Sequence, residues 1–315
     1  MSAAARDGFV DLQVNGYFGV DFNGDDLSPQ TLHQACAQLK ADGNAGILAT
    51  IITDDVDVMC QRLQRLVHLR AADDLASDLI WGVHIEGPFI NETPGFVGAH
   101  PPAAVRPADV DAAQRLLAAA DGLTRIVTLA PERDPGLAVT RFLADRGITV
   151  SAGHCDPSLN ELEAAIQAGL SMFTHVGNGC PMLLDRHDNI IQRALSLARS
   201  LWLCFIADDV HVPCAALGNY LRAAGIDRCI VVTDAISAAG LGQGRYSFGS
   251  QVVEVDEKLV ARIPGVDTHL AGSAVTMPRS AHNLSDLLGL TGTEIDSLTS
   301  LNARQLLQVP KEIEP

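Results

Sequence analysis

The stretch Leu79–Pro88, LIWGVHIEGP, places His84 and Glu86 two residues apart at the end of an apolar run. On a strand, side chains two residues apart point to the same face. A carboxylate at the mouth of a buried strand is costly unless a positive group accompanies it. A metal ion or a buried Arg or Lys would meet that need, and the other polar residues of the chain favour the metal.

Three residues form a candidate metal-binding set: Glu86, His154 and His175. Two neutral imidazoles and one carboxylate are the His₂Glu pattern of catalytic Zn²⁺ sites, which leaves a position for water. Each residue ends a different apolar run, so spacing alone does not exclude a structural role for each His. We expect His84 to pack inside the fold or to orient a neighbour.

Asp234 ends another apolar run, in VVTDA, and is the candidate general base. A carboxylate there can take a proton from water and deliver it to a leaving group. Two other roles stay open: a carboxylate that orients a ligand His, or a helix N-cap, which Ser237 also fits.

Several other residues are candidates for substrate contact. His100 lies in the long loop 89–107, and His211 follows the pair Asp208-Asp209. Backbone N–H groups at Asn178-Gly179 can bind an anion, and Arg186 with a His suits a phosphate, although a lone loop Arg is usually only solvated. The remaining candidates, His33, His68 and His282, fall on predicted helices and are expected to be surface or structural residues.

Eight apolar runs alternate with helix-like segments, which indicates parallel βαβ units. Eight such units predict a closed (β/α)₈ TIM barrel, with an open doubly wound sheet as the alternative. Barrel active sites gather at the C-terminal ends of the strands. The polar candidates at or just past such ends are Gln13, Glu86, His154, His175, His211 and Asp234. The runs are Phe9–Gly16, Gly46–Ile52, Leu79–Pro88, Arg125–Glu132, Ile148–His154, Ser171–Asn178, Leu201–Ala207 and Cys229–Asp234.

The rhythm changes after the eighth run. The segment Gly240–His269 alternates like a β-hairpin inserted before the last helices. Ala271-Gly272-Ser273 then precedes a predicted helix around Ser273–Leu288, for which Ser273 is a candidate N-cap, and a helix over Thr293–Leu307 closes the chain. We expect residues 1–315 to form a single barrel domain.

Composition narrows the functional classes. The 315 residues are 47% hydrophobic and carry a formal net charge of −16, which argues against nucleic acid and anionic membranes as partners. The chain has seven Cys and no CxxC pair, which argues against a disulfide framework and favours a reducing, cytoplasmic setting. We expect Cys155 and Cys180, which lie beside the candidate site, to be buried thiols that pack in the core. The N-terminus lacks the apolar region of a signal peptide, and no apolar run is long enough to span a membrane.

Nine short segments, in order, resemble the N-acetylglucosamine-6-phosphate deacetylase family of the amidohydrolase superfamily. They are DLQVNG (11–16), HIEGPF (84–89), GAHPP (98–102), LAPE (129–132), SAGH (151–154), FTHVGNGCPM (173–182), ADDVHV (207–212), VTDA (232–235) and LAGSAVTM (270–277).

The resemblance implies a metal-dependent hydrolase that removes the N-acetyl group of N-acetylglucosamine 6-phosphate. It implies a divalent metal on Glu86, His154 and His175, with Asp234 as general base and His100 polarising the acetyl carbonyl. It further implies that the sugar phosphate, a small-molecule partner, is bound by Asn178, Gly179, Arg186 and His211. The open alternatives are another N-acyl or cyclic amide substrate, and a barrel that binds sugar phosphates without turnover.

The chain departs from the family at three places. Many superfamily members carry His-x-His on the first strand and hold two metals. This chain has Gln13-Val14-Asn15 at that place, which predicts a single ion, Zn²⁺. Gln13 would bind that ion through water or not at all. The loop Gly177–Cys180 has smaller residues than is usual, which would widen the sugar pocket. We expect the family's small β-sandwich to be missing or reduced to the hairpin. The family's oligomer contacts are therefore not assumed for this chain, although a homodimer is compatible with its sequence.

Overall fold

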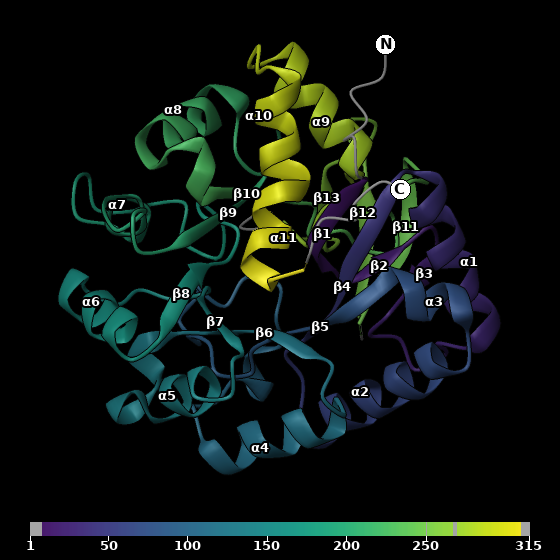
Figure 1. Cartoon of the computed structure of the whole chain (residues 1–315), viewed down its shortest axis with the longest axis horizontal. Helices are drawn as coiled ribbons and strands as arrows, with labels where there is room; N and C mark the ends of the chain where they lie inside the picture. Colours follow the sequence, from purple (N-terminus) through teal and green to yellow (C-terminus); the bar gives the residue numbers. More distant parts are fainter. Residues whose placement is uncertain (1–7, 250, 267–269, 310–315) are drawn as a thin grey trace.

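The computed structural model describes residues 8–249, 251–266 and 270–309. Its main sheet has eight parallel strands that follow one another in chain order. A parallel bridge between Val14 and Ala235 joins the end of the sheet back to its beginning, so the sheet closes. The prediction of a (β/α)₈ barrel is confirmed, and the open-sheet alternative is wrong (Figure 1). The strands are β1 (Phe9–Val14), β4 (Asn44–Ile52), β5 (Ile80–Glu86), β6 (Thr124–Leu129), β7 (Thr149–Ala152), β8 (Leu170–Phe173), β9 (Trp202–Ile206) and β10 (Cys229–Val232).

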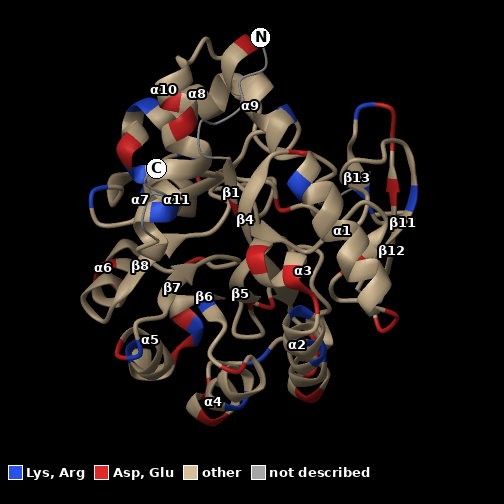
Figure 2. Ribbon diagram, turned by 45° about the vertical axis from the view of Figure 1, so that its right-hand side comes forward, with Lys and Arg blue, Asp and Glu red and all other residues tan. Residues whose placement is uncertain are grey.

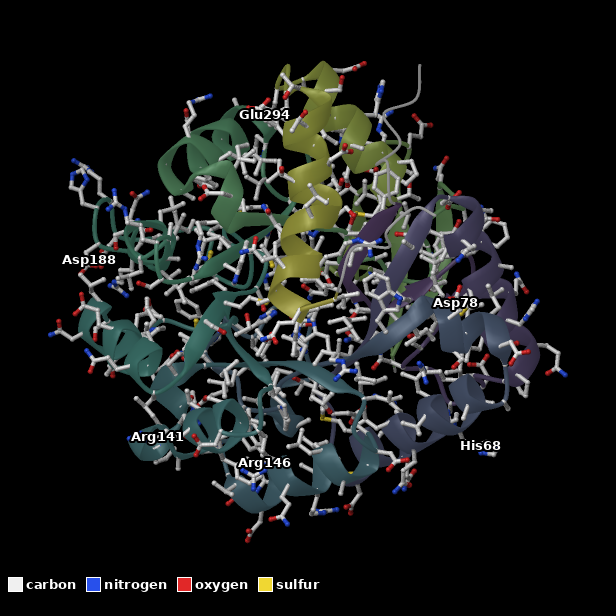
Figure 3. All side chains as sticks on the ribbon, in the orientation of Figure 1. His68, Asp78, Arg141, Arg146, Asp188 and Glu294 are labelled. Atoms are coloured by element: carbon white, nitrogen blue, oxygen red, sulfur yellow. The ribbon has the colours of Figure 1, made fainter. Side chains whose placement is uncertain are left out.

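Helices surround the barrel and turn their charged faces outward (Figure 2). His68, Arg141 and Arg146, labelled in Figure 3, lie at this periphery. The exposed His33, His68 and His282 agree with the expected surface positions. The helices after the strands are α1 (Pro29–Ala41), α2 (Val56–Ala71), α4 (Val110–Ala119), α5 (Ala138–Ala144), α6 (Leu159–Gln167), α7 (Ile190–Ser196) and α8 (Cys214–Ala224).

Helix α1 shows why these segments are helical. Ser28 and Thr31 form a reciprocal capping box, and Pro29 occupies the first turn, where its missing N–H costs nothing. Leu32, Cys36 and Leu39 recur at helical spacing and are fully buried against the sheet.

The strands have two apolar faces. Leu48 packs with Val10, Leu12 and Ile126 in one cluster, whereas its neighbours Ile47 and Ala49 belong to the large cluster shared with the helices. A strand buried on both faces is what a barrel requires, because its interior is filled with side chains.

The segment after β10 forms a small antiparallel sheet of three strands, β11 (Gly244–Phe248), β12 (Gln251–Val255) and β13 (Ala261–Arg262). The alternation predicted the first two strands and missed the third. Residue 250 and residues 267–269, at the end of the predicted hairpin, lie outside the described residues, as do residues 1–7.

The helix predicted from Ser273 begins later, as α9 (Met277–Asp286), and its N-cap is Thr276. Ser273 instead donates its backbone N–H to the Asp234 carbonyl at 2.9 Å, which fixes the turn after β10. The closing helix is continuous but contains a π-helical turn: α10 (Gly292–Asp296), η5 (Ser297–Leu301) and α11 (Asn302–Leu307). The short elements are α3 (Asp74–Leu79), β2 (Gly16–Tyr17), β3 (Val20–Asp21), η1 (Pro102–Ala104), η2 (Pro131–Arg133), η3 (Pro135–Leu137) and η4 (Ile226–Arg228). None of the described helices combines the length and apolar character needed to cross a membrane.

Candidate metal centre and active site

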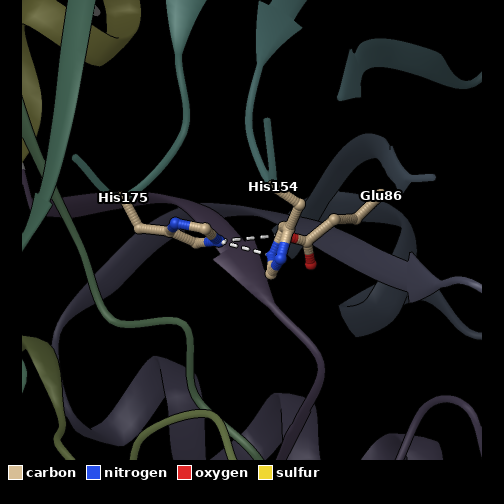
Figure 4. A group of neighbouring side chains, drawn as sticks. All are labelled: Glu86, His154 and His175. Atoms are coloured by element: carbon tan, nitrogen blue, oxygen red, sulfur yellow. Dashed lines mark hydrogen bonds and ion pairs between the residues drawn. The ribbon is translucent and has the colours of Figure 1, made fainter. Parts of the chain in front are cut away.

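Glu86, His154 and His175 meet at the C-terminal rim of the barrel (Figure 4). The Glu86 Oε1 atom lies 3.0 Å from His175 Nε2 and 3.3 Å from His154 Nε2, and the two Nε2 atoms lie 3.1 Å apart. All three side chains are buried. The three potential ligand atoms lie within 4.8 Å of one another, so one ion can reach them all.

The hydrogen bonds of His154 favour a cation at this point. Its Nδ1 lies 2.8 Å from the Phe96 carbonyl, which can only accept, so Nδ1 carries the proton of the neutral ring. The Nε2 lone pair then faces the Glu86 carboxylate and His175. Lone pairs and a carboxylate that converge at a buried position need positive charge between them, and a divalent ion of the Zn²⁺ class fits this donor set.

The charge balance of the cluster leads to the same conclusion. Burial opposes ionisation of Glu86, but the His154 and His175 rings beside it outweigh burial and hold the pKa of Glu86 well below its usual value. Burial lowers the pKa of His175, and the Glu86 carboxylate more than offsets this, so the net pKa is raised. The ionised carboxylate therefore requires either a proton on His175 or a cation in its place.

The backbone at the rim adopts an uncommon conformation. His154, His175 and Asp234 have φ values of 51°, 32° and 51°, in the left-handed region that residues with a Cβ rarely occupy. Such strain collects at functional sites, where surrounding contacts hold it in place. The Gly179 backbone lies close to the His154 ring, because a Cβ there would lie 2.9 Å from His154 Nδ1.

Asp234 lines the same cavity as the three potential ligands. Asn15 donates its side-chain N–H to Asp234 Oδ1 at 2.7 Å, and Asn15 is itself buried. Burial, followed by the nearby Glu86 carboxylate, raises the pKa of Asp234 to about 6. Asp234 caps none of the helices in the described part of the chain, which disfavours the N-cap alternative.

His100 places its Nε2 atom 3.2 Å from His154 Nε2. Burial and the neighbouring His154 lower the pKa of His100 to about 3, so its ring is neutral at physiological pH. A neutral imidazole protonated at Nε2 can donate one hydrogen bond into the space beside the metal-binding set.

His84 lies inside the barrel, as expected, and not in the metal-binding set. Its ring nitrogens contact the Leu12 carbonyl at 3.1 Å and the Thr128 hydroxyl at 2.7 Å. Gln13 donates its side-chain N–H to Glu86 Oε1 at 3.1 Å, while Gln13 Oε1 is buried with no hydrogen-bond partner among the described residues.

The remaining candidates separate into two groups. His211, Asn178 and Gly179 line the cavity, whose volume is about 400 Å³. His211 is held by Asp208, whose carboxylate lies 2.6 Å from Nδ1, so Nε2 is not used by this pair. Arg186, in contrast, is exposed and is absent from the described lining of the cavity.

Sequence reasoning missed two supporting residues. Asn15 shares a strand face with Gln13, and this alternation indicates which way its side chain points. Its partner Asp234 is 219 residues away, so the sequence does not reveal the hydrogen bond between them. Asp208 precedes His211 by three residues, and only the structure shows that it orients that ring.

A scan against protein-family models finds no match. Direct comparison with curated proteins does find relatives. The chain is 34% identical to the N-acetylglucosamine-6-phosphate deacetylase of Bacillus subtilis over 306 residues, which covers 96% of this chain and 75% of the relative. It is 35% identical to the Bos taurus enzyme of the same name, with 96% and 74% coverage. It is 30% identical to the N-acetylgalactosamine-6-phosphate deacetylase of Escherichia coli O157:H7, with 96% and 77% coverage.

Solved structures agree with the sequence relatives. A variant N-acetyl-D-glucosamine-6-phosphate deacetylase from Mycobacterium smegmatis, in complex with N-acetyl-D-glucosamine-6-phosphate, superposes with a TM-score of 0.86 at 30% identity, covering 96% of this chain and 78% of that one. The Thermotoga maritima enzyme gives a TM-score of 0.83 at 28% identity, with the same coverage. The chain thus spans about three quarters of the length of these relatives, and it belongs to the N-acetylglucosamine-6-phosphate deacetylase family of amide hydrolases.

Proposed function

We propose that this chain hydrolyses the N-acetyl group of N-acetylglucosamine 6-phosphate to glucosamine 6-phosphate and acetate, with one divalent ion, Zn²⁺, on Glu86, His154 and His175. The observation that carries the proposal is the convergence of these three side chains in one cavity with Asp234. When bound, the ion would supply Lewis-acid activation of water and of the acetyl carbonyl.

We propose Asp234 as the group that moves protons. As a carboxylate it accepts a proton from the attacking water, and as a carboxylic acid it returns that proton to the departing amine. A pKa raised to about 6 suits both duties, because the carboxylate still predominates at neutral pH while it takes up a proton more readily than an ordinary Asp. Asn15 keeps the carboxylate oriented through its 2.7 Å hydrogen bond.

We propose that His100 donates a hydrogen bond to the acetyl oxygen as negative charge develops there. Its low pKa keeps it a neutral donor, and its burial places the donor where water does not compete. Gln13 holds Glu86 in place, and its unpartnered Oε1 can accept from a water beside the site.

The phosphate end requires donors away from the reacting amide. We propose His211 Nε2, the Gly179 backbone N–H and the Asn178 side-chain amide for this role, because these residues line the cavity. The Asn178 backbone N–H already donates to the His175 carbonyl at 2.9 Å. Arg186 stays a predicted phosphate ligand, on the loop that continues from Gly179.

A cytoplasmic location is part of the proposal. All seven Cys are free thiols, and Cys155 is buried, which suits a reducing compartment.

Acetate release tests the proposal directly. The purified chain, reconstituted with Zn²⁺, should release acetate from N-acetylglucosamine 6-phosphate faster than from the unphosphorylated sugar. The panel should include N-acetylgalactosamine 6-phosphate, because a relative named for that substrate is 30% identical. Release from an N-acyl amino acid but from neither phosphosugar would refute the substrate, and binding of phosphosugar without acetate would refute the reaction.

A further inference from the structure

The carboxyl group of Asp11 is buried inside the barrel and takes no part in the proposed reaction. Asp11 is 1% exposed, and its oxygens accept three hydrogen bonds within the described structure. Oδ2 lies 2.6 Å from Thr233 Oγ1, and Oδ1 accepts the backbone N–H groups of Thr233 and Gln13, both at 3.2 Å. Because it is costly to withdraw a carboxyl group from water, these contacts indicate a role for Asp11.

Asp11 and Thr233 join the two strands at which the barrel closes. Strands β1 and β10 are the two ends of the eight-stranded sheet, and within the described residues one parallel bridge, between Val14 and Ala235, connects them. Strand β10 ends at Val232, and the next N–H, that of Thr233, is donated to the Asp11 side chain. The side chain of Asp11 thereby supplies a contact that strand pairing supplies elsewhere in the barrel.

Thr233 extends this contact to the turn that carries Asp234. Thr233 Oγ1 accepts the Ala235 N–H at 3.0 Å, so hydrogen bonds hold the residues on both sides of Asp234. The Ser273 N–H holds the Asp234 carbonyl from the other side, at 2.9 Å. Asp234 has a φ of 51°, a conformation that a residue with a Cβ keeps only where its surroundings impose it. The contact between Asp11 and Thr233 supplies part of that constraint.

The hydrogen bond between Asp11 and Thr233 can form in both protonation states of Asp11. Burial, opposed by hydrogen bonds from Thr233, raises the pKa of Asp11 to about 7. The carboxylate accepts the proton of the Thr233 hydroxyl. The carboxylic acid donates its own proton to Oγ1, and the hydroxyl can then donate to the Gln13 carbonyl, 3.4 Å away. The contact is therefore positional and does not require one particular charge.

We propose that Asp11, acting through Thr233, is a positioning residue that keeps the Asp234 carboxylate in the cavity beside the metal-binding set. Strand β1 then holds Asp234 twice: Asp11 fixes its backbone, and Asn15, directly after the strand, donates to its carboxylate at 2.7 Å. The inference rests on the proposed function for the proton-carrying role of Asp234, whereas the anchoring of the backbone is independent of that role.

A second pair with the same chemistry offers a matched control. Asp134 Oδ2 accepts both the hydroxyl and the backbone N–H of Thr140 at 2.7 Å, and Oδ1 accepts the Val139 N–H at 3.0 Å. Asp134 and Thr140 are buried, as are Asp11 and Thr233. The control pair lies at the start of α5 and is absent from the described lining of the cavity. Loss of the Thr140 hydroxyl therefore reproduces the structural cost without touching the turn of Asp234.

The kinetic test compares Thr233→Val with Thr140→Val, since valine replaces the hydroxyl with a methyl group of similar shape. At pH 8, Thr233→Val should lower kcat for acetate release by about 10-fold, with KM and Zn²⁺ content within about twofold of the wild type. A misplaced proton carrier affects the transition state and not substrate binding. Thr140→Val should lower the melting temperature and leave kcat within about twofold. Thr233→Ser keeps the hydroxyl and should recover most of kcat, and Thr233→Ala is a second variant in case Thr233→Val folds poorly.

A double-mutant cycle tests whether Asp11 acts through Thr233. Asp11→Ala should lower kcat by about 10-fold or more. Adding Thr233→Val to Asp11→Ala should lower kcat by less than about threefold further, because both changes break one contact. Fully multiplied losses in the folded, Zn²⁺-loaded double variant would show that the two residues act separately and would overturn the inference.

Amide hydrogen exchange separates this inference from the proposed function, because it needs no turnover. The Ser273 and Asn15 N–H groups donate to the Asp234 and Ala235 carbonyls, and neither bond is altered directly by Thr233→Val. Both amides should exchange about 10-fold faster in Thr233→Val than in the wild type and in Thr140→Val. Unchanged exchange would overturn the anchor, and faster exchange with wild-type kcat would overturn the positioning role. Absence of acetate release from the wild type, with the exchange difference intact, would refute the proposed reaction and support the anchor.

Discussion

The hydrogen bond from Asn15 to Asp234 gives a prediction about the pH dependence of catalysis. In Asn15→Ala, the donor 2.7 Å from Asp234 Oδ1 is removed from a buried position. A hydrogen bond to a charged group contributes about 1.5–3 kcal/mol. Because the bond favours the ionised carboxylate, its loss should raise the pKa of Asp234 by about 1–2 units, at about 1.36 kcal/mol per unit.

The wild-type starting point comes from the site itself. Burial and then the Glu86 carboxylate raise the pKa of Asp234 to about 6, and a bound cation would act in the opposite direction. We therefore expect the acidic limb of the kcat/KM profile at about pH 6 or below. In Asn15→Ala the limb should move upward by about 1–2 pH units, so that activity at the wild-type midpoint falls by about 5- to 50-fold and recovers at alkaline pH.

The assay is acetate release between pH 5 and 9, with metal content and thermal unfolding followed in parallel. Asn15→Ser is a second variant in case Asn15→Ala folds poorly. Asn44→Ala is the matched control: Asn44 is also buried, but its side chain bonds the Leu39 carbonyl and has no contact with Asn15 or Asp234 among the described residues. An acidic limb that stays in place, or moves downward, in a folded and metal-loaded Asn15→Ala would show that Asn15 does not stabilise the reactive carboxylate.

Four further results are expected. Asp234→Asn should lower kcat by about 10²-fold or more while metal content stays at the wild-type level, and normal turnover would exclude Asp234 as the proton carrier. Gly179→Ala should weaken metal binding by about 10-fold, measured by competition with a chelator. The added Cβ would lie 2.9 Å from His154 Nδ1, and the φ of residue 179 is 60°, where a Cβ is strained. An unchanged affinity would mean that the loop adjusts freely. Chelation of the ion should lower the melting temperature, since a ligand bound only by the folded state stabilises it; identical melting curves would contradict a resident ion. Burial raises the pKa of Asp21 to about 6, so the folded state holds this proton more tightly than the unfolded state, and stability should fall as pH rises from about 4 to 6 and level off above. Asp21→Asn should remove up to about 3 kcal/mol of that fall in urea titrations across this range, and parallel pH curves for the two proteins would argue against it.

The barrel was predictable because each strand is a short, nearly continuous apolar run, which is how a strand buried on both faces appears in a sequence. Glu86, His154, His175 and Asp234 could be selected because they end such runs, and parallel strands bring their C-terminal ends to one rim. The family resemblance then indicated the reaction, hydrolysis of an N-acetyl group, and the sequence relatives confirm the family.

Sequence patterns are weaker guides where contacts, rather than periodicity, decide the structure. Strand β13 has two residues, too few for an alternation to be visible. Ser273 has the residue type of an N-cap, but its backbone bonds to Asp234, so the helix begins beyond it at Met277. Helix α3 has six residues and depends on the Asp73 cap, which accepts the Ala76 N–H at 2.8 Å.

The predicted phosphate ligand Arg186 shows the same limit of sequence patterns. Arg186 follows the candidate anion loop in sequence and was therefore selected, although the described structure places it outside the cavity lining. The small sheet β11–β13 is held against the barrel by side-chain contacts such as that from Gln251 to Ala99. No spacing rule connects that sheet to the rim.

The most direct test of the central claim is the metal stoichiometry of the purified chain, measured by elemental analysis alongside His154→Ala, His175→Ala and Asp234→Asn. We predict close to one divalent ion per chain in the wild type and in Asp234→Asn, and loss of most of the ion in both His variants, because each removes one of three ligands. Undiminished metal in folded His154→Ala and His175→Ala, or none in the wild type after exposure to Zn²⁺, would contradict a cation held by Glu86, His154 and His175.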